Sequence, residues 1–223
     1  MTLNIKKTHS ERLMPLVDRL LTESGLEREA IEAVAAAAGP GSFTGLRIGV
    51  STARALAQGL GIPAVPVCTL AALAEAVPAP GALICPLLDA RRSQVYTALF
   101  RRSPASPYHL ETVLEPSALA LDELIRYLED EEYLSPDYSA KEPVVFLGEG
   151  LHSYAEKLKQ ALPGRALISS APFRLCRAAL VALRARRLLE QNPGASYLEL
   201  LPRYLRPPEA ERKAAEKKGG LNQ

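Results

Sequence analysis

The sequence has no tryptophan, only three cysteines and three histidines among 223 residues, and few aromatic side chains overall. Cys68, Cys85 and Cys176 are widely spaced and form no CxxC pair, which is typical of reduced intracellular thiols and not of a disulfide framework. The histidines show neither an HxxxH nor an HExxH spacing. We therefore expect no metal site formed by this chain alone.

Long apolar runs are also missing. The longest, 33–38 and 82–88, end far short of the roughly 20 residues that a membrane-spanning helix needs. The first residues, MTLNIKKTHSERL, lack the apolar core of a signal peptide, so we expect a cytoplasmic protein without a membrane partner. Lys and Arg number 27 against 25 Asp and Glu, a net charge of +2, which argues against a polybasic polymer binder.

The sequence contains enough apolar residues for a sizeable core, since 48% of the residues are hydrophobic. Residues 2–7 alternate at Leu3 and Ile5, which predicts the end of a strand. Thr8 and Glu11 form a capping box for a helix that Gly25 ends, and its apolar face is wide enough to contact two surfaces. The other elements expected in this half are strands over 33–38 and 64–67 and helices over 44–60 and 70–77.

The second half repeats this order after two leading strands. Residues 83–88 and 94–100 flank Asp89–Ser93, which predicts a hairpin. The remaining expectations are strands near 110–114, 144–147 and 166–168 and helices over 121–131, 151–162 and 173–191. The pattern indicates a duplicated α/β unit with domains at 1–80 and 81–194 and a tail at 195–223, in which the first copy lacks its opening hairpin.

Small residues recur every fourth position through the helix predicted at 44–60 and its flanks. Glycines inside a helix cost about 1 kcal/mol each relative to alanine, so close packing or function must offset them. Tight packing on the chain's own sheet is one explanation and docking of another protein is the other. Phosphate capture at the helix start is disfavoured, because neither a P-loop Lys-Ser/Thr nor a GxGxxG motif follows. The series is Gly41, Gly45, Gly49, Ala53, Ala57 and Gly61.

Four segments together resemble one family. Residues 39–49, GPGSFTGLRIG, are similar to the signature of the TsaB (YeaZ) family, the dimerisation subunit of the bacterial tRNA threonylcarbamoyladenosine machinery. Residues 8–21 (THSERLMPLVDRLL) resemble its first helix, 89–96 (DARRSQVY) its second-domain hairpin, and 202–211 (PRYLRPPEAE) its C-terminal string. The matches follow the family's order and span most of the chain.

The resemblance implies a duplicated actin-like ATPase fold (ASKHA, ribonuclease H-like) with two subdomains and no catalysis of its own. Family members pair with the related catalytic subunit TsaD, with the ATPase TsaE joining them. The complex threonylcarbamoylates the adenosine 3′ of the anticodon in tRNAs that read ANN codons. ATP and metal are therefore expected on the partner subunits and not on this chain, and a homodimer is possible when TsaD is missing.

Pairing in the family uses a bundle of the first two helices of each partner, which correspond here to 9–24 and 44–60. A wide apolar face and a small-residue stripe both suit helix-to-helix docking. The candidate contact residues are His9, Arg12, Leu13, Leu16, Val17, Leu20, Gly45, Arg47, Gly49, Val50, Ala53, Arg54 and Ala57.

Departures from the catalytic relative support an inactive role. The relative's HxxxH pair is reduced here to His9, with Leu13 four residues on, and Arg91 and Arg92 replace small residues of a phosphate hairpin. The chain starts inside the family's third strand, which we interpret as a misassigned start codon. A stand-alone ASKHA enzyme, either a phosphotransferase or peptidase-like, and a homodimeric binding module remain the alternatives. Contact with tRNA phosphates and a solvated helix face are the two explanations for a group of arginines near the end of the second half, and the solvated face is favoured. The group is Arg174, Arg177, Arg184, Arg186 and Arg187.

Overall fold

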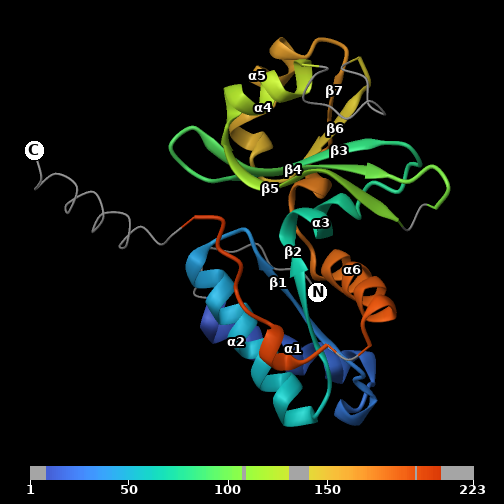
Figure 1. Ribbon diagram of the computed structural model, residues 1–223. Helices are drawn as coiled ribbons and strands as arrows, with labels where there is room; N and C mark the ends of the chain where they lie inside the picture. The colour runs from blue at the N-terminus through green and yellow to red at the C-terminus, as the bar shows by residue number, and fades with distance from the viewer. Residues whose placement is uncertain (1–8, 107–108, 131–140, 194, 207–223) are drawn as a thin grey trace, which may run out of the picture.

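A computed structural model describes residues 9–106, 109–130, 141–193 and 195–206 and shows two lobes (Figure 1). The first lobe holds the ends of the described chain, and the second lobe holds its middle. The first lobe consists of α1 (His9–Ser24), β1 (Val34–Gly39), α2 (Phe43–Leu60), β2 (Ala64–Cys68) and α6 (Ala178–Gln191). The second lobe consists of β3 (Leu83–Asp89), β4 (Gln94–Arg102), β5 (Leu110–Ala120), α4 (Leu121–Glu129), β6 (Val144–Leu147), α5 (Leu151–Ala161) and β7 (Ala166–Ile168), and α3 (Thr69–Ala74) lies between the lobes.

The second lobe is built on a five-stranded sheet in the order β5-β4-β3-β6-β7. β3 pairs antiparallel with β4 and parallel with β6. On one face Phe146 packs with Leu124 of α4 and Leu158 of α5, and on the other Ile84 packs with Leu70 of α3. Both faces of this sheet are therefore covered, as expected for a sheet with central parallel strands.

The first lobe has only two described strands, β1 and β2, which pair in parallel. Val34 and Ala36 pack with α2 on one face, whereas Ala35 and Ala37 pack with α6 on the other. The alternation follows from the two-residue period of a strand, and it gives three layers of helix, sheet and helix.

α2 is bounded by local signals. The Ser42 hydroxyl accepts a hydrogen bond from the Gly45 amide at 3.4 Å, and Gly61 ends the helix with φ +67°. These are the roles in which serine and glycine are favoured at helix ends. The predicted strand at 33–38 and helix at 44–60 are both confirmed, each shifted by one residue at its start.

The tail returns to the first lobe after α6. Leu200 is completely buried there, and the Arg203 amide donates to the Ala38 carbonyl at 2.7 Å. Gly39 has φ +129°, and a Cβ at this position would collide with the Arg203 carbonyl oxygen. Glycine is therefore required where the tail crosses β1.

Three boundaries differ from the sequence expectation by three residues or more. The helix predicted over 173–191 begins at Ala178, because extended backbone at Leu175–Arg177 carries the chain from the second lobe to the first. β5 continues to Ala120, where it pairs with Gln94 along a long β4, and α3 ends at Ala74. The strand predicted over 2–7 lies outside the described residues. No helix in the described ranges is both long and apolar enough to cross a membrane.

Candidate protein-docking surface

α1 is the least covered helix relative to its apolar content. Of its side chains from Glu11 to Ser24, none is buried, although the helix carries six large apolar residues. Leu13, Leu16 and Val17 are half-buried, while Met14 is 46% exposed and Leu20 is 48% exposed. Arg12 is exposed as well. For His9, only its place at the first position of α1 is described. A helix with this apolar face has surface left to bury against something else.

Three of the predicted contact residues on α2 require a correction. Val50, Ala53 and Ala57 are at most 5% exposed and pack with Ala64 and Leu200 in the core of the first lobe. Side chains packed in this way against β1, β2 and the tail offer a partner almost no surface, although Ala53 also borders the open cavity beside β1. Packing within the first lobe therefore accounts for this part of the every-fourth-residue pattern. It is one of the two explanations considered for the pattern, the other being docking of another protein.

Gly45 and Gly49 lie toward the open, N-terminal part of the same stripe of α2. A Cβ at Gly49 would meet nothing within 4 Å, and one at Gly45 would meet only the Ser42 side chain. Of the other predicted contacts on α2, Arg47 is exposed and Arg54 is half-buried. These four residues stay predictions as partner contacts.

The start of α2 carries an aromatic group that the sequence patterns did not reveal. The Arg47 guanidinium lies 4.0 Å from the centroid of the Phe43 ring, and its Nε donates to the Tyr204 hydroxyl at 3.1 Å. The Phe43 and Tyr204 rings are 4.9 Å apart. The hydrogen bond and the ring contact hold the tail against α2, and the cation–π contact holds Arg47 against Phe43 within α2. The one sequence feature that could have indicated this contact is the segment 202–211, which contains Tyr204 and resembles the C-terminal string of the family.

An open slot of about 1140 Å³ lies beside β1, between α1 and α2 on one side and α6 on the other. We call this region the slot. Leu13 and Val17 line it from α1, Gly45 and Gly49 from α2, and Ala182 from α6. Its walls are mostly apolar, so water in it is displaced favourably by any apolar group that fits.

A second cavity of about 890 Å³ lies where the start of α2, the tail and the β3–β4 turn meet. Asp89, Arg91 and Arg92 line it, and Arg91, Arg92 and Ser93 all have positive φ, between +53° and +61°. The Arg91 amide donates to Asp89 Oδ1 at 2.7 Å, which holds this uncommon conformation. The predicted hairpin is confirmed.

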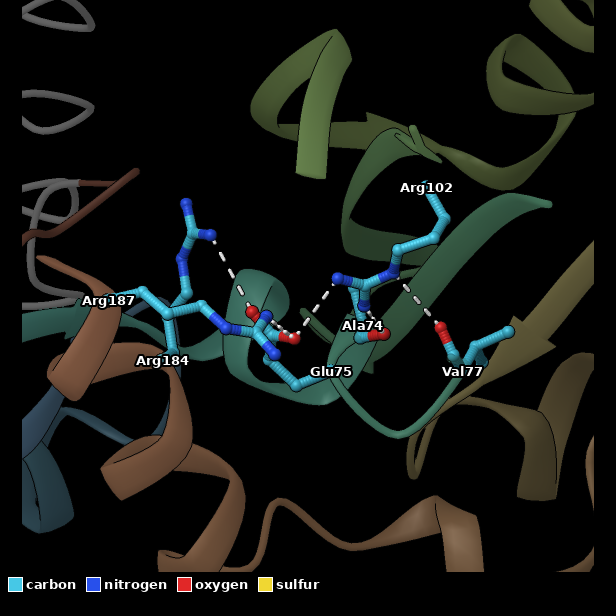
Figure 2. Close-up of polar contacts among 6 residues, drawn as sticks. All are labelled: Ala74, Glu75, Val77, Arg102, Arg184 and Arg187. Atoms are coloured by element: carbon cyan, nitrogen blue, oxygen red, sulfur yellow. Dashed lines mark hydrogen bonds and ion pairs between the residues drawn. The ribbon is translucent and has the colours of Figure 1, made fainter. Parts of the chain in front are cut away.

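A buried carboxylate joins the two lobes (Figure 2). Glu75 follows α3, is 1% exposed at its side chain, and pairs with Arg102 of β4 at 3.2 Å. From α6, Arg187 pairs with the same oxygen and Arg184 lies 3.6 Å from the other. Burial lowers the pKa of Arg102 below its usual value, and the Glu75 charge opposes that shift. Glu75 therefore forms ion pairs with guanidinium groups from both lobes at once.

This cluster corrects one expectation and adds a missed residue. Arg184 and Arg187 are not on a solvated face, because they turn inward to Glu75, whereas Arg186 is exposed and pairs with Glu190. The only feature of the sequence that could have indicated Glu75 is its place as a single acidic residue directly after the apolar run TLAALA.

The cysteines have the character of packing residues. Burial raises the pKa of Cys85 to about 12 despite a hydrogen bond with Thr97, and burial raises that of Cys176 to about 11. Thiols with such pKa values are poor nucleophiles at neutral pH. Within the described ranges, no three His, Cys, Asp or Glu side chains gather closely enough to hold a metal ion.

Comparison with known proteins gives consistent similarities. The family model for TsaD, tRNA N6-adenosine threonylcarbamoyltransferase, matches residues 4–214. The tRNA threonylcarbamoyladenosine biosynthesis protein TsaB of Bacillus subtilis (strain 168) is 33% identical over 209 residues, which are 94% of this chain and 84% of that protein. The protein of that name from Escherichia coli (strain K12) is 39% identical over 115 residues, 49% of this chain and 50% of that protein.

The solved structure of YeaZ from Pseudomonas aeruginosa has the same architecture. It matches with a TM-score of 0.68 at 28% identity and covers 89% of this chain and 86% of that chain. Sequence and structure therefore agree over nearly the whole length, and the duplicated actin-like fold expected from the resemblance is confirmed. The chain belongs to the TsaB (YeaZ) family.

Proposed function

We propose that this chain is a non-catalytic docking subunit of cytoplasmic tRNA threonylcarbamoyladenosine biosynthesis. It binds the catalytic subunit TsaD through the outer faces of α1 and α2, and TsaE joins the pair. The transfer of the threonylcarbamoyl group to tRNA takes place on the partner, which also holds the ATP and the metal.

The observation that carries the proposal is the state of α1. Burying an apolar side chain is worth roughly 1.5–3 kcal/mol relative to leaving it exposed, yet Leu20 is 48% exposed and the half-buried Leu16 lies one turn from it. A second protein that covers this face recovers that free energy. Arg12, which is exposed on the same helix, supplies a polar edge of the kind that surrounds apolar contacts in interfaces.

A non-catalytic role fits the chemistry of the described side chains. Cys85 and Cys176 are held in the thiol form at neutral pH. Glu75, the most enclosed carboxylate, is already shared among guanidinium groups. Neither arrangement supplies an activated nucleophile or a free general base.

The test compares two leucines that are equally exposed. Leu20 of α1 and Leu167 of β7 are each 48% exposed, so replacing either by aspartate has a small effect on the fold. Leu20→Asp is expected to weaken binding to the TsaD of the same organism by at least about tenfold, whereas Leu167→Asp leaves it unchanged. Calorimetry with the two purified proteins measures both values.

The same variants separate the rival functions. Threonylcarbamoylation of tRNA by the reconstituted proteins should fall with Leu20→Asp and survive Leu167→Asp. If both variants bound TsaD equally well, α1 would not be part of the interface. ATP hydrolysis at enzyme-like rates by this chain alone, insensitive to Leu20→Asp, would favour the stand-alone enzyme. A dimeric mass without TsaD that Leu20→Asp converts to a monomer would assign the same face to self-association.

A further inference from the structure

Five arginines lie around the second cavity, the one between the start of α2, the tail and the β3–β4 turn. Four of them line the cavity. The fifth, on α2, lies at its edge, because its guanidinium contacts the Phe43 ring and its Nε donates to the Tyr204 hydroxyl, and both of these residues line the cavity. The three segments are far apart in the sequence, so the fold gathers these side chains. We call the group the arginine rim: Arg47, Arg91, Arg92, Arg203 and Arg206.

The arginine rim carries more positive charge than its surroundings neutralise. Two carboxylates, Asp89 and Glu149, line the same cavity, against five guanidinium groups. Among the residues that the structure describes, no carboxylate forms an ion pair with any of the five. Asp89 Oδ1 accepts the Arg91 amide instead. Since like charges held close together repel each other, the arginine rim favours an anionic partner.

The β3–β4 turn keeps two of these arginines where glycine would be favoured. Arg91, Arg92 and Ser93 have φ of +61°, +53° and +58°. Residues with a Cβ rarely adopt this left-handed conformation, whereas glycine adopts it freely. Such residues persist only where the surrounding structure imposes the conformation, and they concentrate at functional sites. Both arginine side chains are exposed, so packing does not explain them, and the turn indicates a role for them in binding.

Two aromatic rings and an apolar wall accompany the arginine rim. Phe43 is half-buried and Tyr204 is 38% exposed, and both line the cavity. Leu46, Leu88 and Ala90 line it as well and are buried. Aromatic side chains are the surfaces on which proteins stack the unpaired bases of RNA. At about 890 Å³ the cavity has the size of pockets that hold small organic ligands, which is enough for one base with its sugar.

We propose that the arginine rim binds single-stranded RNA. Phosphates of the RNA contact the guanidinium groups, and one unstacked base enters the cavity and stacks on Tyr204. Duplex RNA is a poorer fit, because its bases are stacked on one another and are not available to aromatic rings. A free mononucleotide has the same chemistry, but its phosphate lies at one end, whereas the exposed arginines of the rim come from three separate segments.

The identity of the RNA rests on the proposed function, under which it is the tRNA that TsaD modifies. The proposed docking face and the arginine rim share α2, since Gly49 borders the slot and Phe43 lines the second cavity. An RNA bound at the start of α2 therefore lies beside a partner that is docked on α1 and α2. The binding itself depends on this chain alone and can be measured without the partner.

Fluorescence anisotropy with a labelled single-stranded RNA of about ten nucleotides and the full chain tests the proposal. The double variant Arg91→Gly with Arg92→Gly removes two rim charges, and it should stay folded because glycine suits the positive φ of the turn. It should weaken binding at least about tenfold and lower the slope of log Kd against log salt by about 1.4, which is two phosphate contacts at about 0.7 each. Arg19→Gln with Arg186→Gln is the matched control, because it removes two exposed charges that do not line this cavity, and it should leave binding within about twofold.

A second pair of variants tests the stacking of a base. Tyr204→Ala removes the ring and should weaken RNA binding by about tenfold, since stacking on one aromatic side chain contributes a factor of this order. Tyr204→Phe keeps the ring, loses only the hydroxyl that accepts from Arg47, and should bind RNA like the unaltered chain. Circular dichroism of every variant confirms that the fold is retained. Equal binding by Tyr204→Ala and Tyr204→Phe would refute the stacking of a base on this ring.

The remaining outcomes separate the alternatives. Lack of RNA binding by the unaltered chain at low salt would overturn the proposal but not the docking of TsaD, which is measured separately with Leu20→Asp. Equal losses in the double variant and its control would show attraction to the net charge alone. Displacement of the RNA by AMP at a similar concentration would assign the cavity to a free nucleotide, and equal affinity for a duplex of the same length would also refute the proposal. The expected RNA binding by a chain that fails to bind TsaD would support the site and refute only the tRNA as its ligand.

Discussion

The two lobes have similar strand and helix orders but differ in how fully their sheets are covered. In the second lobe both faces of a five-stranded sheet are packed, and Phe146, Leu124 and Leu158 have no exposed surface. In the first lobe the described sheet has two strands, and Val34 to Ala37 are all only half-buried. The difference teaches that the second lobe is stabilised by its own core, whereas the first lobe leaves apolar surface for additional contacts.

The largest expected effect concerns the link between the lobes. Glu75→Gln leaves the buried Arg102 without its countercharge, and we expect a loss of about 3–5 kcal/mol in the free energy of unfolding. Glu156→Gln is the control, because its pair with Lys159 is exposed and is worth at most about 0.5 kcal/mol. Urea denaturation measures both. A loss below about 1 kcal/mol for Glu75→Gln would show that the lobes do not depend on this carboxylate.

Next in size is a direct comparison of the two cores. Leu124→Ala in α4 removes a completely buried side chain and should cost about 2–5 kcal/mol. Leu56→Ala in α2 removes a half-buried side chain that faces the slot, and it should cost less than half as much if the slot is empty. Equal losses in denaturation would mean that the slot is filled in solution, which narrows the contrast between the lobes.

A smaller effect is expected from the Cys85 thiol of the second lobe. Its pKa is raised from 9.0 to about 12 in the folded state, so above pH 9 the unfolded chain loses this proton while the folded chain keeps it. The free energy of unfolding should therefore fall by about 1.4 kcal/mol per pH unit between pH 9 and 12 on account of this group. Cys85→Ala should lack that contribution to the slope, and identical slopes in the two proteins would contradict the burial of the thiol.

The smallest effect distinguishes two glycines of the same helix. A Cβ meets nothing within 4 Å at either Gly49 or Gly59, so alanine at each should raise stability by up to about 1 kcal/mol through helix propensity. Only Gly49 borders the slot. If other atoms fill the slot in solution, Gly49→Ala should gain less than Gly59→Ala in thermal denaturation. Equal gains would indicate open space above Gly49.

Much of the fold could be predicted from the spacing of apolar residues and from the glycine, proline and turn residues between the apolar segments. Gly39-Pro40-Gly41 marked the end of the alanine strand, and the Asp89–Ser93 turn between two apolar runs marked the hairpin. The late start of α6 could not be predicted, because the helical periodicity of the segment continues across Leu175–Arg177. The backbone is extended there because this segment connects the two lobes, and that connection is a property of the whole fold.

The sequence could not separate docking residues from core residues within the small-residue stripe, and the reason is physical. A stripe of small residues reports that something packs closely, but it does not say whether the neighbour is the same chain or another. Val50, Ala53 and Ala57 pack internally, while Gly45 and Gly49 remain open. The Glu75 cluster depends on residues 27 and 112 positions away in the sequence, and no local pattern connects them.

The passage of the tail through the first lobe has a consequence for synthesis on the ribosome. Leu200 completes the core beside Val50 and Ala57, and Arg203 bonds to β1, so the lobe whose strands emerge first needs residues that emerge after the whole second lobe. The strands and helices of the second lobe all lie between Leu83 and Ile168, and they can assemble while the ribosome is still translating. We therefore expect the second lobe to be able to fold first, because the first lobe lacks Leu200 and Arg203 until the whole of the second lobe has been made.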